Sequence, residues 1–300
     1  MSVVVRARGK VNLTLDVLGK RADGFHEVSM VMQSISLSDV LSFNSADGLE
    51  LIWDPRGNRP PSLALDESND ILRAAKLLKQ LTGTKRGAAI WLDKRLPIAS
   101  GLGGGSADGA ATLVGLNKLW QLNYTEKELM IIASHLGSDM PFCIVGGTAE
   151  ASGRGEIIRR LPYVGLWHLA IFKPPQGIST KLVYTSLKSE GRVQAPVTEL
   201  LVRSIEAGRS ESLPNFMSND LESVTFSIMP ELQRLKERLL FMGAEKVMMS
   251  GSGPAVFALS KDEELAERLV RDCTPLGWWS SKAETAPLGC EFITEEQNAL

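Results

Sequence analysis

The stretch Pro97-Ile-Ala-Ser-Gly101-Leu-Gly103-Gly104-Gly105-Ser106-Ala-Asp108 decides how the rest of this chain of 300 residues is interpreted. It lies between a strand-like run, 88–92, and a helix-like run, 110–120. Four glycines in five positions carry no Cβ atoms and accept positive φ angles, so several backbone N–H groups can converge on one anion. The following helix adds unpaired amides and the positive end of its dipole. The pattern predicts a phosphate-binding loop.

Three widespread glycine motifs do not account for this loop. A P-loop needs the sequence Gly-Lys-Ser/Thr, and Gly104-Gly105-Ser106 contains no lysine. A dinucleotide-binding fingerprint needs glycine where Ser106 stands, and a nucleophile elbow needs glycine where Asp108 stands. The alternatives that remain are a phosphate loop of another kind and a turn that only lets a helix and a strand pack closely. Clustered glycines at the start of a helix favour the phosphate loop.

Composition places the chain among ordinary globular proteins. Hydrophobic residues make up 44% of it and charged residues 23%, and 300 residues are enough for two domains with separate cores. The net charge of -2 gives the molecule no overall attraction to nucleic acid or to an anionic membrane. A phosphate ligand therefore needs a local site, and we expect neither a nucleic-acid partner nor a membrane partner.

The cysteines and the N-terminus favour the cytoplasm. Cys143, Cys273 and Cys290 are odd in number, far apart in the chain and not arranged as CxxC, so we expect neither a disulfide framework nor a zinc site. The apolar run 3–5 ends at Arg6 and is too short for a signal peptide. With no transit segment before the first strand, a bacterial cytoplasm is the expected location.

A β-hairpin is predicted at the start of the chain. Residues 3–17 alternate polar and apolar side chains, which is typical of a strand, and the pair Asp23-Gly24 predicts a turn into a return strand over 25–43. A lysine on such a strand is most often a solvated edge residue. The polar residues expected to share one face of the first strand are Lys10, Asn12, Thr14 and Asp16.

The remaining pattern predicts an α+β architecture in two parts, with a boundary near residue 161. Helices over a small, mainly antiparallel sheet make up the second part. The tail 284–300 has no clear period, and we expect it to be partly mobile. The other predicted elements are helices over 71–81, 110–120 and 126–134, after 174–180, from about 230, and over 263–273, and strands over 88–92, 146–155, 169–172, 245–249, 255–259 and 278–283.

Several of these motifs, taken in order, resemble the GHMP kinase superfamily, whose members phosphorylate small alcohols with ATP. The glycine loop resembles the family's phosphate motif, and residues 250–254, Ser-Gly-Ser-Gly-Pro, resemble its C-terminal glycine motif. The other matching stretches are 9–13, 21–26, 137–141, 179–180 and 219–222. Motifs in the right order along most of the chain are more specific than any one of them.

The resemblance implies a two-lobed fold with the active site in the cleft. The N-terminal lobe, 1–161, would resemble ribosomal protein S5 domain 2 and bind ATP, and the C-terminal lobe, 162–300, would be a ferredoxin-like α/β plait. Mg²⁺ is implied by ATP chemistry, but no carboxylate pair marks a metal site, and its ligands stay unknown. The residues implied to hold the nucleotide are Pro97, Gly101, Leu102, Gly103, Gly104, Gly105 and Ser106.

The resemblance also implies the catalytic pair. Asp139 would be the base that accepts a proton from the attacking hydroxyl, and Lys10 would lie beside it and offset charge on the transferred phosphoryl group. Taken alone, Asp139 is equally explained as the N-cap of a helix with Pro141 in its first turn. Ser106 could approach the phosphates or cap the helix, and Asp108 could cap the helix, complement its dipole or orient loop amides.

Within the superfamily, the match is strongest to enzymes that phosphorylate the 2-hydroxyl of 4-diphosphocytidyl-2-C-methyl-D-erythritol in the non-mevalonate isoprenoid pathway. It implies that His26 hydrogen-bonds the cytosine edge and that Phe25 and Tyr184 stack on its two faces. Asn12 and Thr180 would also contact this cytidine diphosphate-linked polyol, although Thr180 is also a plausible helix N-cap. The family commonly has tyrosine where Phe25 stands, so stacking is kept and one hydroxyl is lost.

Two other interpretations remain. The chain could be another kinase of the superfamily, of the homoserine or mevalonate type, but residues 24–26 and 219–222 argue against a small hydroxy acid as substrate. It could also be a non-catalytic binding module on the same fold, but Lys10 and Asp139 are both present. We expect a monomer or a weak homodimer.

Overall fold

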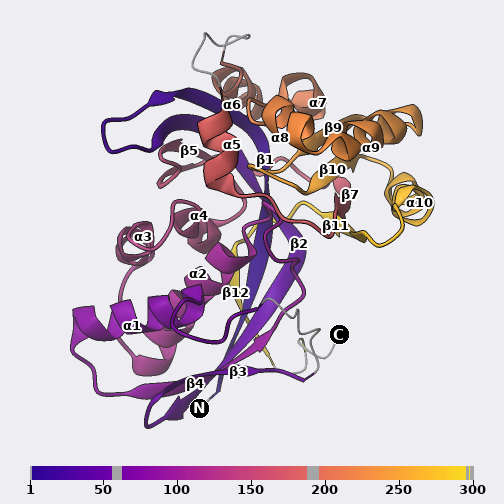
Figure 1. The fold of residues 1–300 in the computed structure, drawn as a ribbon. Helices are drawn as coiled ribbons and strands as arrows, with labels where there is room; N and C mark the ends of the chain where they lie inside the picture. The colour runs from indigo at the N-terminus through magenta and orange to yellow at the C-terminus, as the bar shows by residue number, and fades with distance from the viewer. Residues whose placement is uncertain (1, 56–62, 188–195, 295–296, 298–300) are drawn as a thin grey trace.

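A long β-hairpin runs through the molecule and takes part in the packing of both lobes (Figure 1). The computed structural model describes residues 2–55, 63–187, 196–294 and 297. The hairpin consists of β1 (Val3–Lys20) and β2 (His26–Ala46), which pair antiparallel. The turn predicted at Asp23-Gly24 joins them, and the two predicted strands are confirmed, each slightly longer than expected.

The first lobe is a mixed sheet covered by helices on one side. Its strands run in the order β12-β1-β2-β4-β3, with β5 paired to β2 and β6, and β8 paired to β1. Figure 1 shows α1 to α4 on one side of the hairpin and α8 to α10 on the other. Elements of this lobe are β3 (Leu49–Trp53), α1 (Asp70–Thr82), β4 (Gly87–Asp93), α2 (Gly104–Trp120), α3 (Glu126–Ser134), α4 (Met140–Val145), β5 (Thr148–Gly153) and β6 (Ile157–Arg160).

The second lobe is an antiparallel sheet in the order β11-β7-β10-β9, the strand order of a ferredoxin-like plait. Alternate residues of β7 face opposite ways: Ala170 and Phe172 pack under the helices, and Leu169 and Ile171 pack toward the hairpin. Its elements are β7 (His168–Lys173), α5 (Thr180–Ser186), α6 (Thr198–Glu206), the 3₁₀ helix η1 (Ser210–Ser212), α7 (Leu213–Phe216), β8 (Ser218–Asn219), α8 (Glu222–Ile228), α9 (Pro230–Phe241), β9 (Lys246–Met249), β10 (Val256–Ser260), α10 (Glu263–Cys273) and β11 (Trp279–Glu284). The α+β, two-lobed fold predicted from the sequence is confirmed.

Two irregularities in β1 correct the prediction that its polar residues share one face. The pairing of β1 with β2 shifts register between Arg8 and Lys10 and again between Asn12 and Thr14. Each shift turns the following residues to the other face of the strand, because side chains alternate with a period of two. Lys10 and Asn12 therefore face the helices of the first lobe.

The residues after the second shift face the opposite way. Asp16 accepts hydrogen bonds from the backbone of Val197 and Thr198, and Thr14 pairs with the Thr198 hydroxyl at 2.9 Å. Thr14 and Asp16 thus anchor the start of α6, on the side of the strand away from Lys10.

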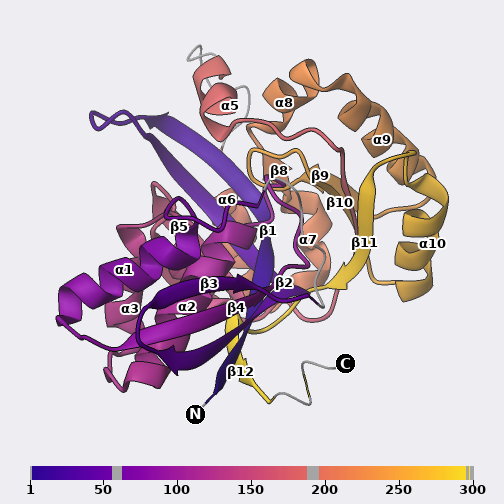
Figure 2. The same cartoon turned by 60° about the horizontal axis from the view of Figure 1, so that its bottom comes forward.

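The end of the chain also differs from the prediction. β12 (Cys290–Ile293) pairs antiparallel with β1 and joins the first sheet beside the N-terminus (Figure 2). These four residues form a strand in a tail for which the sequence showed no clear period. A simple division at residue 161 does not account for β12, nor for β8, which also pairs with β1. Among the described residues, no helix is both long and apolar enough to cross a membrane.

The return of the tail rests on a close backbone contact at Gly289. A Cβ atom added there would lie 2.2 Å from the carbonyl oxygen of Cys143, so the Gly289→Ala protein has to shift backbone in α4 or in the tail. We expect it to lose about 1–3 kcal/mol of the free energy of unfolding, measured by urea denaturation. Gly48→Ala is the matched control, because a Cβ atom at Gly48 meets nothing within 4 Å. Equal stability of the two variants would contradict the tight docking of the tail.

Candidate active site

An open pocket of about 1040 Å³ lies where the hairpin, the glycine loop and the second lobe meet. Its wall includes residues from β1, the loop before α2, the N-terminus of α4 and α5. The predicted site residues that line it are Lys10, Asn12, Phe25, His26, Pro97, Gly101, Gly103, Gly104, Gly105, Ser106, Asp139, Thr180 and Tyr184. Segments more than a hundred residues apart thus form one concave surface.

The glycine loop presents the N-terminus of α2 to this pocket. The helix begins at Gly104, six residues earlier than predicted, after Gly103 at φ 73°. No side chain in the described part of the chain caps it, so the first amides are left for a ligand. Ser106 is therefore not the helix cap, and Asp108 lies beyond the first turn.

The second lobe supports the loop from behind. The Ser250 hydroxyl donates a hydrogen bond to the carbonyl of Gly101 at 2.9 Å, and the amide of Ala255 donates to the carbonyl of Ser100 at 2.9 Å. A Cβ atom on Gly101 would lie 2.2 Å from the carbonyl oxygen of Ser250. Gly101 also has φ 84°, which glycine alone adopts readily. The two glycine motifs thus pack directly on each other.

The stretch 219–222 orders this second glycine motif. The side-chain amide of Asn219 donates to the carbonyls of Met249 and Gly251 at 2.9 and 2.8 Å. The carboxylate of Glu222 accepts a hydrogen bond from the Met249 amide at 2.9 Å. Asp220 accepts one from the backbone of Val17 in β1. This motif therefore ties the second lobe to the hairpin.

Lys10 and Asp139 meet beside the loop. Lys10 Nζ lies 3.2 Å from Asp139 Oδ2 and donates a hydrogen bond to Asn12 Oδ1 at 2.8 Å. Lys10 is 3% exposed, whereas the side chain of Asp139 is 31% exposed and open to the pocket. A Cβ atom on Gly103 would lie 3.0 Å from Lys10 Cγ, so the lysine stem packs against the loop itself. An ammonium and a carboxylate thus lie together at the phosphate loop.

The local structure separates the two explanations of Asp139. It occupies the N-cap position of α4, with Pro141 in the first turn, but its side chain makes no capping hydrogen bond. The carboxylate points to Lys10 instead. Because an N-cap aspartate normally accepts a bond from the next amides, this orientation favours a role in the pocket.

Three rings line the wall at the hairpin tip. The rings of His26 and Tyr184 have centroids 5.0 Å apart at an interplanar angle of 33°. Phe25 is 52% exposed, and the guanidinium of Arg154 lies 5.0 Å from its ring centre. Burial raises the pKa of the Tyr184 hydroxyl, and the charge of Asp139 adds to this. These residues form an amphipathic surface on which a planar ring can stack.

One predicted residue, Leu102, is placed differently from expectation, and the structure excludes the alternative interpretation of Thr180 as a helix cap. Leu102 is fully buried in the core and is absent from the pocket wall; its carbonyl accepts a hydrogen bond from the Lys10 amide at 2.9 Å. Thr180 is not the N-cap of α5, because Ser179 accepts the bond from the Leu182 amide. The Thr180 hydroxyl lies 2.9 Å from that of Ser252, across the cleft between α5 and the second glycine motif.

Sequence reasoning missed a buried ion triad beneath the loop. Lys94 Nζ lies 2.6 Å from Asp39 Oδ2 and 2.6 Å from Asp108 Oδ2, and all three side chains are at most 5% exposed. A Cβ atom on Gly104 would lie 3.1 Å from Lys94 Nζ. Asp39 also accepts hydrogen bonds from the amides of Arg95 and Leu96 at 2.6 and 2.8 Å. The triad therefore joins β2, the loop and α2.

The charges of the triad perturb one another. Burial by itself lowers the pKa of Lys94, but the charges of Asp108 and Asp39 more than reverse this and hold it above its usual value. Burial raises the pKa of Asp108 well above its usual value, and Asp39 adds to this while Lys94 opposes it. No local pattern marks the triad, because the Lys94–Asp39 pair joins residues 55 positions apart in the chain.

Asp70 is a second residue that sequence reasoning missed. It is the first residue of α1 and lines the pocket. A Cβ atom on Gly105 would lie 3.0 Å from its Oδ2 atom, and its Oδ1 atom accepts a bond from Arg73 at 2.6 Å. Carboxylate and hydroxyl oxygens such as those of Asp70 and Ser106 are ligands suited to Mg²⁺. The donor set at the loop therefore fits a magnesium ion held mainly by phosphates and water.

Comparison with known proteins gives a consistent result. Residues 69–147 match the GHMP kinases N terminal domain, and residues 201–274 match GHMP kinases C terminal. A protein of Pelotomaculum thermopropionicum named 4-diphosphocytidyl-2-C-methyl-D-erythritol kinase is 44% identical over 275 residues, which cover 90% of this chain and 93% of that protein.

Solved structures show the same architecture. A crystal structure of 4-(cytidine 5'-diphospho)-2C-methyl-D-erythritol kinase has a TM-score of 0.75 and 30% identity, covering 94% of this chain and 99% of that one. Homoserine kinase from Cytophaga hutchinsonii has a TM-score of 0.76 but 20% identity, covering 97% of each chain. The second likeness concerns the fold alone.

The ion triad makes a test of stability possible. We expect Lys94→Met to lower the free energy of unfolding by about 3–5 kcal/mol, because it leaves two buried carboxylates without their counterion. Urea denaturation at neutral pH measures the loss. Lys76→Met is the control, since Lys76 pairs with Glu67 on the surface and should change stability by no more than about 0.5 kcal/mol. A Lys94→Met protein as stable as the control would mean that the triad contributes little to the free energy of unfolding.

Proposed function

This chain belongs to the GHMP kinase family, and we propose that it transfers the γ-phosphate of ATP to the 2-hydroxyl of 4-diphosphocytidyl-2-C-methyl-D-erythritol. The enzyme class, an ATP-dependent small-molecule kinase, follows from family membership. The substrate follows from relatives of that name that are 43–44% identical over 90% of the chain. The observation that carries the proposal is the Lys10–Asp139 pair, which faces the pocket beside the glycine loop.

Asp139 acts as the base in this proposal. An alcohol is a poor nucleophile, and a carboxylate within hydrogen-bonding reach can accept its proton as the oxygen attacks the γ-phosphorus. Lys10 lies 3.2 Å from Asp139 and can direct a further N–H group at the transferred phosphoryl group. Asn12 fixes the ammonium by accepting one of its three hydrogen bonds. The side chains of Lys10 and Asp139 therefore need to move little before the phosphoryl transfer.

The loop amides would bind the polyphosphate. Gly103, Gly104 and Gly105 have no side chains that could keep a phosphate away from the backbone. A Cβ atom added at any of the three would also approach a neighbouring side chain, that of Lys10, Lys94 or Asp70 respectively. Mg²⁺, when bound with ATP, would neutralise phosphate charge, with Asp70 and Ser106 as nearby oxygen donors. Positioning and electrostatic stabilisation by these groups supply the larger share of the rate enhancement.

The hairpin tip and α5 would bind the cytidine head group. Stacking on an aromatic ring contributes about 1–3 kcal/mol per base in nucleic-acid binders, a scale that applies loosely here. Phe25 and Tyr184 offer ring faces and His26 offers a ring nitrogen, all on one wall. In this structure the imidazole of His26 itself packs against the Tyr184 ring at a centroid distance of 5.0 Å. Thr180 and Asn12 complete the proposed contacts.

A homoserine or mevalonate kinase is the main alternative. The fold alone does not separate them, because homoserine and mevalonate kinases give TM-scores of 0.76 and 0.73 at 20% and 18% identity. The aromatic wall favours a planar base over a small hydroxy acid. Within this proposal the protein acts in the cytoplasm as a monomer or a weak homodimer, with Mg²⁺ as the metal.

A substrate panel tests the assignment. Protein, Mg-ATP and one alcohol at a time are mixed, ADP release is followed, and the product mass is measured. We expect turnover with the cytidine diphosphate-linked methylerythritol and little with homoserine or mevalonate. Consumption of either hydroxy acid without the cytidyl compound would overturn the substrate but not the kinase class.

Asp139→Asn tests the base. It should lower kcat by about two to four orders of magnitude, because the amide cannot accept the proton. ATP affinity and Tm should stay close to those of the wild type. Asp47→Asn, at an exposed turn, is the control and should retain full activity. Unchanged kcat in Asp139→Asn, or loss of folding, would remove the proposed role.

His26→Ala tests the head-group site. The Kd for the cytidyl substrate should rise about tenfold or more while the Kd for ATP hardly changes, because a hydrogen bond to the base is lost. Isothermal titration with each ligand measures both constants. His135→Ala is the control, since His135 lies at the exposed end of α3 outside the pocket. Equal substrate affinity in the two variants would exclude His26 from the site.

A further inference from the structure

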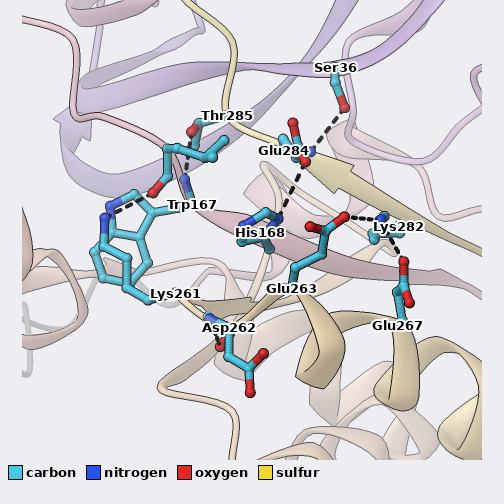
Figure 3. A network of polar contacts seen from close by, with 12 residues as sticks. Ser36, Trp167, His168, Lys261, Asp262, Glu263, Glu267, Lys282, Glu284 and Thr285 are labelled. Carbon is cyan, nitrogen blue, oxygen red and sulfur yellow. Dashed lines mark hydrogen bonds and ion pairs between the residues drawn. The ribbon is translucent and has the colours of Figure 1, made fainter.

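A second group of ligand-type side chains lies in the second lobe, and none of its members lines the active-site pocket. His168 is the first residue of β7, Glu284 is the last residue of β11, and the two are cross-strand neighbours. Glu263, the first residue of α10, approaches them from the helix (Figure 3). One potential ligand atom from each of the three lies within 4.8 Å of the others.

The imidazole of His168 is the unusual member of this group. The residue is 7% exposed, and its Nδ1 atom is buried without a hydrogen bond in the described structure. The carboxylate atom Glu284 Oε1 lies 3.4 Å away, within ion-pair range only (Figure 3). Buried ring nitrogens are normally hydrogen-bonded, so this atom lies beside the Glu284 carboxylate with its bonding capacity unused.

The surrounding charges favour a cation. Glu263, Glu267 and Glu284 contribute three negative charges, and Lys282 contributes one positive charge, which leaves a net charge of -2 when the imidazole is neutral. Lys282 lies between Glu263 and Glu267, on the side away from His168 (Figure 3). A carboxylate has two oxygens, so Glu263 can keep Lys282 on one of them and offer the other to a metal.

The spacing suits a tetrahedral ion. Ligand atoms about 2.1 Å from Zn²⁺ in a tetrahedral site lie about 3.4 Å from one another. The separation of His168 Nδ1 and Glu284 Oε1, 3.4 Å, already has this value. Glu263 can close the remaining gap by rotation, since its side chain is 52% exposed. A nitrogen ligand with two carboxylates suits Zn²⁺ better than Mg²⁺, which prefers oxygen alone.

We propose that His168, Glu263 and Glu284 bind one divalent transition-metal ion, Zn²⁺ in preference, with water completing the coordination. The ion joins the start of β7, the end of β11 and the N-terminus of α10. The amide of Glu284 also donates to the Ser36 hydroxyl of β2 at 2.9 Å, so the site lies where the second lobe contacts the hairpin. Its role is structural, because it lies outside the pocket.

The test is metal binding by the full chain. Protein stripped with a chelator is titrated with Zn²⁺ by calorimetry in excess Mg²⁺, which fills sites that prefer oxygen ligands. We expect one equivalent to bind and to raise Tm. His168→Ala and Glu284→Gln should each weaken binding at least about tenfold, since each removes a ligand. Glu267→Gln, the matched control, removes a nearby charge but no ligand, and should weaken binding far less than either of these variants.

Co²⁺ provides a spectroscopic check on the same proteins. The wild type and Glu267→Gln should show the visible absorption of cobalt in a site with a nitrogen ligand, and His168→Ala should not. Absence of saturable Zn²⁺ binding, or equal affinity in Glu284→Gln and the wild type, would overturn the proposal. If His168→Ala does not fold, Glu284→Gln still tests the proposal. The Glu284 side chain is 38% exposed, so this substitution should leave the fold intact.

Discussion

The close approach of other atoms to the backbone of the glycine loop is the constraint on which the structure depends. A Cβ atom on Gly101 would meet the carbonyl of Ser250, one on Gly103 would meet the stem of Lys10, and one on Gly104 would approach Lys94. The first residues of α2 have no side-chain cap from the described residues and line the pocket. One local feature thus determines how tightly the lobes pack and where an anion can bind. A larger residue would disturb both at once.

The hairpin brings Lys10 and Asn12 to that loop. Two register shifts in β1 turn Lys10 and Asn12 toward the helices, while Val11 and Leu13 pack in the core under the second sheet. The strand therefore serves both lobes within a few residues. Asn219, Asp220 and Glu222 bind β1 and the second glycine motif, which holds the lobes together at the same point. The geometry of the site is in this way a consequence of how the lobes share one strand.

Buried charge is used differently in two parts of the molecule. Beneath the loop, Lys94 is paired with both Asp39 and Asp108, and these ion pairs tie three elements together. Around His168 the carboxylates outnumber the cations, and a ring nitrogen is left unbonded. Every member of the triad has an ion-pair partner within the protein, although Asp108 Oδ1 makes no hydrogen bond to a described residue, whereas His168 Nδ1 is the atom that we propose for a metal ligand. The triad lies between β2 and α2, and the His168 group lies where the second lobe contacts the hairpin.

The sequence by itself determined the glycine loop, the hairpin, most helices and the α+β class, because these depend on local periodicity, turn residues and glycine spacing. The site residues predicted from the order of motifs, Leu102 excepted, all line the pocket, and their roles stay predictions. Only the tertiary structure decided which way Lys10 and Thr14 face, since a bulge changes strand parity without changing composition. It alone paired Lys94 with Asp39, returned β12 to the first sheet and gathered His168 with two glutamates. Those contacts join residues far apart in the chain, and their energy depends on packing that no local pattern contains.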